Sequence, residues 1–171
     1  MLNKLASRLQ SMESFDQFVF ARALHILAVV LWIGGVAFVT TVLIPSLKDL
    51  DNGQDRMQLF ERLEGRFAFQ AKLTTLLTGL SGFWMIDYLN AWSRYLDPQF
   101  WWMHLMSLVW LIFTLVLFVL EPLFLHQLFH RLAMNNSDQA FQRLQTMHIV
   151  LLSISLIAIA AAMAGAHGYA F

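Results

Sequence analysis

Charged residues divide the chain into long apolar runs separated by short polar segments. No Asp, Glu, Lys or Arg occurs between Arg22 and Lys48, from Pro98 to Leu120, or from Leu144 to Phe171. Each run supplies the roughly 20 apolar residues that a helix needs to cross a bilayer. A shorter run between Lys72 and Asp87 is a weaker candidate, because the Lys72 side chain must extend back to the interface. The pattern predicts four transmembrane helices, at about 18–45, 67–89, 99–126 and 146–168.

These spans predict an all-α fold: an integral membrane four-helix bundle with up-down-up-down topology, forming a single domain over residues 1–171. A soluble bundle would need a polar face on each helix, and the run 111–120 has none. Residues 1–16 place Leu2, Leu5, Leu9 and Met12 on one helical face, which predicts an interfacial amphipathic helix. This polar segment and the lack of a small-residue cleavage site argue against a signal peptide.

The composition agrees with a membrane protein and excludes several other classes. Hydrophobic residues make up 58% of the 171 residues and charged residues 13%, against roughly 45–50% and 25% in soluble domains. Eleven basic residues balance eleven acidic ones, so nothing indicates a nucleic-acid partner. The absence of cysteine excludes disulfides, covalently attached haem and cysteine nucleophiles, and leaves histidine, methionine and carboxylates as metal ligands.

Basic residues in the connections predict the orientation. Seven of the eleven Lys and Arg residues lie between spans one and two or between spans three and four, which places those connections inside and both termini outside, in the periplasm of a bacterial-type plasma membrane. The basic N-terminal segment would favour the opposite orientation, since it would bind an anionic cytoplasmic leaflet. Both orientations remain open at this point.

The six histidines separate into two sets by depth along the predicted spans. An outer set consists of His25, His104 and His167, and an inner set of His126, His130 and His148. A single interfacial histidine is usually an amphipathic anchor. Because separate helices bring three imidazoles to similar depths, and ionisable residues within spans are usually functional, we interpret the sets as cofactor or metal ligands. His126 and His130, four residues apart, lie on one helical face and suit a shared metal ion.

Other marked residues have two interpretations each. Arg22 and Arg94 flank the outer histidines and suit haem propionates, or are ordinary interfacial arginines. Trp32 lies seven residues after His25, on the same helical face, where it lines a cofactor pocket or packs in the core. Glu121 precedes Pro122 in span three. Its carboxylate could be a ligand, a proton carrier or the counter-ion of Lys72, and of these three roles we favour the ion pair with Lys72.

Three segments resemble a known family. The pattern LHxxAxxxWxGG at 24–35 resembles the first helix of CopD-like membrane proteins, and also that of HemJ-type protoporphyrinogen oxidases. TGLSGFWMI at 78–86 and WWMH at 101–104 are similar to short CopD-like proteins. The resemblance implies a compact helical bundle that binds haem b or copper, with His25 as a ligand. The chain lacks the later acidic and lysine signature of HemJ-type enzymes and the additional spans of copper importers.

Several functions agree with this pattern. The first is electron transfer or other redox chemistry by one or two haem b groups, with a quinone or lipophilic substrate; His25 and His104 are the preferred axial pair and His167 the reserve. The second is copper or transition-metal binding or transport of the CopD type. The third is a HemJ-like porphyrinogen oxidase, an oxidoreductase. The fourth is a subunit that assembles with a respiratory partner protein; homo-oligomers also stay open.

Overall fold

The computed structural model describes residues 2–48, 53–125 and 137–169, and all the secondary-structure elements in these ranges are helices, joined by short turns. The first of four helical rods comprises α1 (Leu2–Phe38), a π-helical segment η1 (Val39–Leu43) and α2 (Ile44–Lys48) in direct succession. The second rod is α3 (Gly53–Tyr88), the third is α4 (Trp101–Leu115) continued by the π-helix η4 (Val116–Leu125), and the fourth is α6 (Ser137–Ala166). Two short 3₁₀ helices connect α3 to α4: η2 (Trp92–Leu96) and η3 (Pro98–Phe100).

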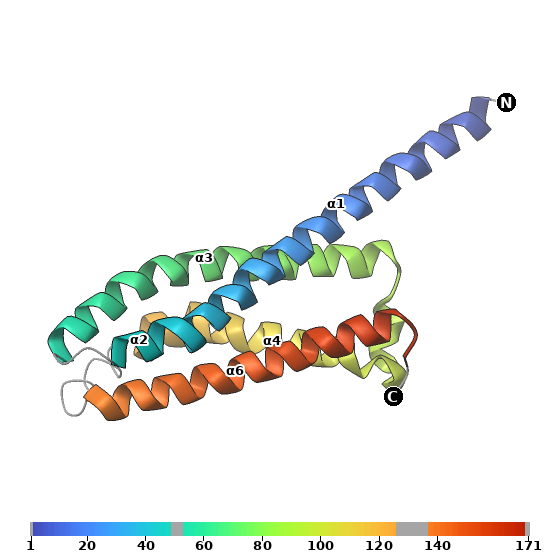
Figure 1. The fold of residues 1–171 in the computed structure, drawn as a ribbon. Helices are drawn as coiled ribbons and strands as arrows, with labels where there is room; N and C mark the ends of the chain where they lie inside the picture. The colour runs from blue at the N-terminus through green and yellow to red at the C-terminus, as the bar shows by residue number, and fades with distance from the viewer. Residues whose placement is uncertain (1, 49–52, 126–136, 170–171) are drawn as a thin grey trace.

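The four rods lie side by side, and successive rods run in opposite directions (Figure 1). Helix α1 packs against α3, and α4 packs against α6. We call the end where α3 ends and α4 begins the η2 end, and the end where α2 ends and α3 begins the α2 end (Figure 1). The predicted all-α fold with four long helices is confirmed.

Three helices of the described part are long and apolar enough to cross a membrane: Met12–Lys48, Pro98–Leu123 and Asp138–Ala166. Helix α3 is not among them, since its N-terminal half carries many charges and its charge-free stretch runs only from Leu73 to Ile86. The second predicted span is therefore a helix in the structure, but its length and composition alone do not indicate that it crosses a membrane.

The N-terminal segment differs from the prediction. The sequence predicts a separate interfacial helix at 1–16, whereas α1 runs without a break from Leu2 to Phe38. No proline or glycine occurs before Gly34 to end a helix. The N-terminal part of α1 consequently projects beyond the other rods as a continuation of the same helix (Figure 1).

Pro122 lies within the π-helix η4. Proline has no N–H to donate within a helix, and its ring collides with the carbonyl one turn earlier. A wider π-helical turn is one known adjustment of a helix, and it rotates the residues that follow relative to an α-helix. His126, which follows this segment in the sequence, lies outside the described residues.

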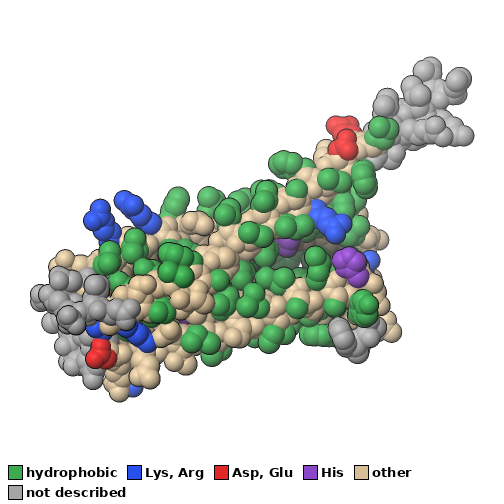
Figure 2. Space-filling view, in the orientation of Figure 1, with side chains coloured by type: hydrophobic (Ala, Val, Ile, Leu, Met, Phe, Trp, Pro, Cys, Tyr) green, Lys and Arg blue, Asp and Glu red, His purple; other side chains and the backbone are tan. Residues whose placement is uncertain are grey.

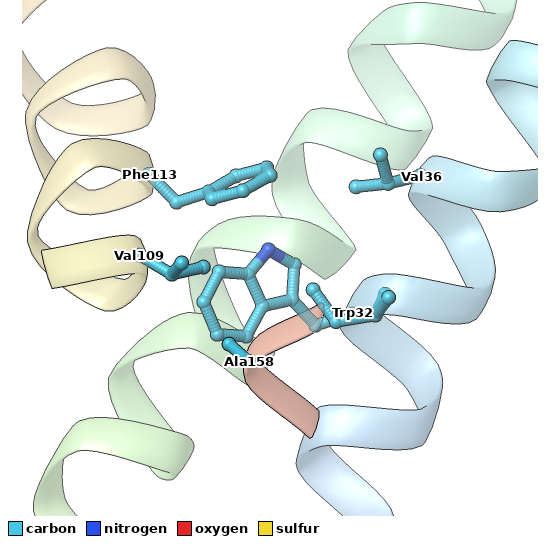
Figure 3. Close-up of a cluster of buried hydrophobic side chains, with 6 residues drawn as sticks. Trp32, Val36, Val109, Phe113 and Ala158 are labelled. Carbon is cyan, nitrogen blue, oxygen red and sulfur yellow. The ribbon is translucent and has the colours of Figure 1, made fainter. Parts of the chain in front are cut away.

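Two apolar clusters fill the bundle. In one, Trp32 of α1 packs edge-on against Phe113 of α4, with ring centroids 4.9 Å apart, beside Val36, Val109 and Ala158 (Figure 3). The second cluster joins η1 and α2 to Phe60 of α3 and Phe141 of α6. Apolar side chains also cover much of the outer surface, where Leu80 is 68% exposed (Figure 2). An apolar exterior of this extent is typical of helices that contact lipid.

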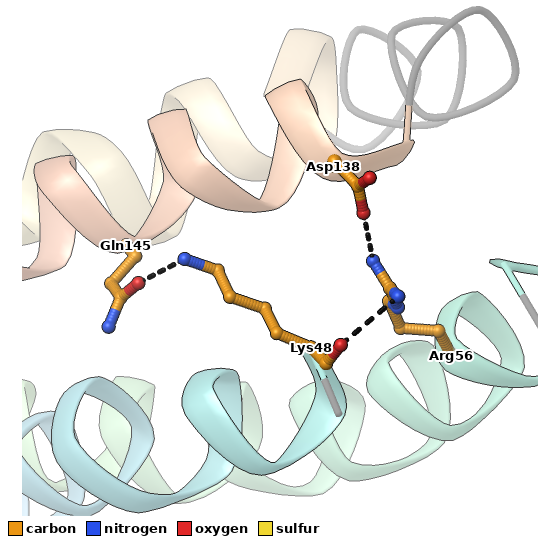
Figure 4. Close-up of polar contacts among 4 residues, drawn as sticks. All are labelled: Lys48, Arg56, Asp138 and Gln145. Atoms are coloured by element: carbon orange, nitrogen blue, oxygen red, sulfur yellow. Dashed lines mark hydrogen bonds and ion pairs between the residues drawn. The ribbon is translucent and has the colours of Figure 1, made fainter. Parts of the chain in front are cut away.

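Polar contacts hold three rods together at the α2 end. The buried guanidinium of Arg56 on α3 contacts Asp138 of α6 at 2.6 Å and donates to the Lys48 carbonyl at the end of α2, at 3.2 Å (Figure 4). The Lys48 ammonium donates to the side chain of Gln145. Arg56 thus satisfies a helix-terminal carbonyl that has no partner within α2.

Toward the η2 end, close packing of the helices depends on glycines, which have no side chain. A Cβ atom on Gly79 of α3 would lie 2.6 Å from the indole of Trp110. That indole cannot easily move, because its Nε1 donates to the Thr75 carbonyl at 2.9 Å. A Cβ on Gly165 of α6 would likewise overlap the indole of Trp102.

Replacing Gly79 by alanine is therefore expected to destabilise the protein. Overpacking of this kind costs roughly 1–3 kcal/mol, which thermal unfolding of the detergent-purified protein would detect as a lower Tm. Gly65→Ala, on the same helix, is the matched control, because a Cβ there meets nothing within 4 Å. Since alanine favours helix by up to about 1 kcal/mol over glycine, G65A should keep or raise the Tm. A similar decrease in Tm in G79A and G65A would contradict the packing argument.

Candidate histidine site

His25 is held by two groups of the neighbouring helix α3. Its Nδ1 lies 3.0 Å from the Thr78 carbonyl oxygen and 3.0 Å from the Ser81 hydroxyl oxygen. A carbonyl oxygen only accepts, so Nδ1 carries the proton and donates. The Ser81 hydroxyl already donates to the Leu77 carbonyl and can accept from His25. The tautomer is thereby fixed, and Nε2 keeps its lone pair.

The short side chains of α3 make this position possible. A Cβ on Gly82 would lie 3.3 Å from Cε1 of His25, so the imidazole is seated directly against the α3 backbone. The ring is half-buried, and Nε2 has no hydrogen-bond partner among the residues that the structure describes. A histidine whose Nδ1 donates to a carbonyl while Nε2 stays free has the arrangement that metal-ligating imidazoles usually show.

The other described histidines lie at two places. His104 at the start of α4 is exposed and meets the Tyr95 ring edge-on, with centroids 5.2 Å apart. His167 follows the end of α6, is exposed, and its Nδ1 donates to the Met163 carbonyl at 2.7 Å. His25, His104 and His167 thus belong to the η2 half of the bundle. Histidine side chains are visible on this half in Figure 2.

His148 lies toward the α2 end of α6, where its Nδ1 donates to the Leu144 carbonyl at 2.9 Å. The remaining inner residues, His126 and His130, are outside the described residues. Within the ranges 2–48, 53–125 and 137–169, no three His, Asp or Glu side chains gather closely enough to hold a metal ion. This finding concerns sites with three protein ligands, whereas a haem iron takes at most two axial ligands from the protein.

The predicted supporting residues have distinct surroundings. Arg22 is exposed, one helical turn before His25. Arg94 is exposed too, and its guanidinium carbon lies 5.2 Å from the centroid of the Phe100 ring. Trp32 is 3% exposed and packs in the core, and its Nε1 has no hydrogen-bond partner among the described residues.

Lys72 and Glu121 form an ion pair between α3 and η4. The Lys72 ammonium nitrogen lies 2.6 Å from Oε2 of Glu121, and the two side chains are 31% and 29% exposed. The structure therefore contains the ion pair that we favoured for Glu121 over the other two roles.

The sequence did not reveal the two partners of His25, the Thr78 carbonyl and the Ser81 hydroxyl. Ser81 belongs to a set of buried hydroxyl residues on α3, with Thr74, Thr75 and Thr78. Their spacing of three and four residues along one helical face is a signal that could have singled out Ser81, whereas a backbone carbonyl leaves no signal in the sequence.

Comparison with known proteins adds no relative: no family model, curated protein or solved structure matches the chain.

Loss of one member of the ion pair is expected to destabilise the bundle. Glu121→Gln leaves the Lys72 charge without its partner in an apolar environment. Fully buried pairs lose roughly 3–5 kcal/mol in this way, and we expect about 1–2 kcal/mol here because both side chains are partly exposed. The double variant K72M/E121M should unfold at a Tm closer to that of the wild type, since two matched apolar side chains leave no charge unpaired. A double variant less stable than E121Q would contradict this account.

Proposed function

We propose that this chain is a multi-pass membrane protein that binds haem b through His25 and takes part in electron transfer. The observation that carries the proposal is the fixed tautomer of His25, whose Nδ1 donates to Thr78 and Ser81 and whose Nε2 is free. Helix contacts hold the ring before any ligand binds, which lowers the entropic cost of binding. Three helices long and apolar enough to cross a membrane support a lipid-embedded site.

His104 would supply a second histidine to hold the haem, with His167 as the reserve. Both lie in the same half of the bundle as His25 and on different helical rods. Arg22, exposed one turn from His25, has the charge and reach to pair with a propionate. When bound, haem would supply a one-electron carrier, and the residues of the chain would hold and orient it.

The surroundings of this redox site follow from the same proposal. We expect the protein in a bacterial-type plasma membrane with both termini outside, because most Lys and Arg residues then lie on the inner side. The electron donor or acceptor would be a quinone or another lipophilic compound in the bilayer, or a respiratory partner protein at one face.

Absorption spectra of the detergent-purified protein, oxidised and then reduced with dithionite, test the proposal. We expect a Soret band that shifts on reduction, with about one haem b per chain by pyridine haemochrome. The variant H25A should lose this haem, and H104A or H167A should lose it or convert it to a five-coordinate form. H148A is the control at the opposite end and should keep the haem of the η2 half.

Two outcomes would overturn the assignment. Full haem content in both H25A and H104A would exclude these histidines as the ligands. Wild-type protein without haem, but with copper or zinc near one per chain by elemental analysis, would instead favour the metal-binding function implied by the CopD-like resemblance.

A further inference from the structure

A groove lies between the projecting part of α1 and the C-terminal part of α3. Its volume of about 780 Å³ falls within the roughly 300–1,000 Å³ that is common for ligand sites. The lining residues of α1 follow the spacing of one helical face from Glu13 to Leu24, and those of α3 do the same from Leu77 to Trp84. Each helix therefore presents one continuous face to the groove, which extends roughly 16 Å along α1.

The lining changes from polar to apolar along the groove. Its outer end, toward the N-terminus of α1, is formed by Glu13, Asp16 and Gln17. The inner section is mainly apolar, and its residues Phe20 and Leu80 are 71% and 68% exposed, so the described part of the chain leaves this section uncovered. Among the described residues that line the groove, two are acidic and none is basic. The groove thus suits a molecule with a cationic head and an apolar body.

Aromatic contacts place the polar end of the groove at the level of lipid headgroups. Phe18 stacks on Tyr88 at the end of α3, with ring centroids 4.9 Å apart, and Tyr88 stacks on Trp84 at 5.3 Å. Tryptophan and tyrosine are enriched where a membrane meets water. Glu13 and Asp16 precede Phe18 on α1 and therefore lie on the water side of this aromatic level. Acidic side chains are visible on this part of α1 in Figure 2.

The two carboxylates favour a cation at the outer end. Glu13 and Asp16 are three residues apart on one helical face, where like charges repel each other. A positive group beside them offsets this repulsion, whereas a headgroup with only negative charge adds to it. The side-chain amide of Gln17, the next residue, can donate to a phosphate oxygen.

We propose that this groove binds a phospholipid whose headgroup ends in an ammonium group. The ammonium donates to the carboxylates of Glu13 and Asp16, the phosphate accepts from the amide of Gln17, and an acyl chain covers Phe20 and Leu80. The inference rests on the membrane location within the proposed function, but it does not rest on the haem. Loss of lipid binding and absence of haem are therefore separate results, measured in separate experiments.

Lipid binding to the delipidated, full-length protein in detergent tests the proposal. Native mass spectrometry measures the bound lipid at a series of concentrations of phosphatidylethanolamine or phosphatidylglycerol with identical acyl chains. Wild-type protein should bind phosphatidylethanolamine roughly five- to tenfold more tightly, as expected of exposed charge contacts that are individually weak. The double variant E13Q/D16N should bind both lipids equally. Glu61→Gln is the charge control and should keep the preference, because Glu61 lies on α3 outside the groove.

A second pair of variants tests the position of the lipid. Ala21→Trp should block the groove, because Ala21 lines it, and this variant should lose the tightly bound phosphatidylethanolamine. Ala23→Trp is the matched control: Ala23 lies two residues later on α1, is exposed and does not line the groove. A23W should bind the lipid as the wild type does.

Several outcomes would overturn the proposal. Equal or tighter binding of phosphatidylglycerol by the wild type would exclude selection of the ammonium group. A quinone that binds the wild type more tightly than either lipid, but does not bind A21W, would assign the groove to a redox substrate instead. An unchanged preference in E13Q/D16N, or equal binding by A21W and A23W, would exclude the groove as the site. Should A21W fail to fold, E13Q/D16N decides, because it changes only exposed side chains.

Discussion

The antiparallel contact between α1 and α3 is the constraint on which the remaining structure depends. Two helices approach closely only where side chains are small, and α3 offers such a face from Ala71 to Gly82. On α1, Gly35 leaves room for the Phe67 ring. The same contact seats His25 against Gly82. A larger side chain at either glycine would separate the helices and remove the surface that orients the imidazole.

This contact also explains how an apolar bundle accommodates polar groups. Within the described helices, buried hydroxyls donate to carbonyls of their own helix, as Thr40 does to Val36 and Ser155 to Leu151. They can be buried without a partner helix supplying acceptors. The hydroxyl of Thr75 departs from this rule, since it has no partner among the described residues, and Nε1 of Trp32 is also buried without one. Both residues lie near Trp110, which donates to the Thr75 carbonyl and packs against the Trp32 cluster.

The sequence predicts the helices well because bilayer-length apolar runs have few alternative structures. It also predicts the pair of Lys72 and Glu121, since isolated opposite charges in neighbouring spans have few other partners. It did not predict the continuity of α1, which depends on the absence of a helix-ending residue near position 16, nor the π-helices. The partners of His25 could not be derived, because they depend on which face of α3 packs against α1. For Trp32 the sequence left a pocket and the core open, and in the structure its side chain packs in a buried apolar cluster.

The two nitrogens of His25 have separate roles in the proposed electron transfer. Nδ1 faces the hydroxyls of α3, while Nε2 is free to bind. The Thr78 carbonyl and the Ser81 hydroxyl, which accept from Nδ1, would make Nε2 a more basic ligand as well as orienting the ring. In a medium of low dielectric constant Coulomb energies exceed those in water severalfold. The same two contacts would therefore affect the electronics of a bound group more within the bundle than at its surface.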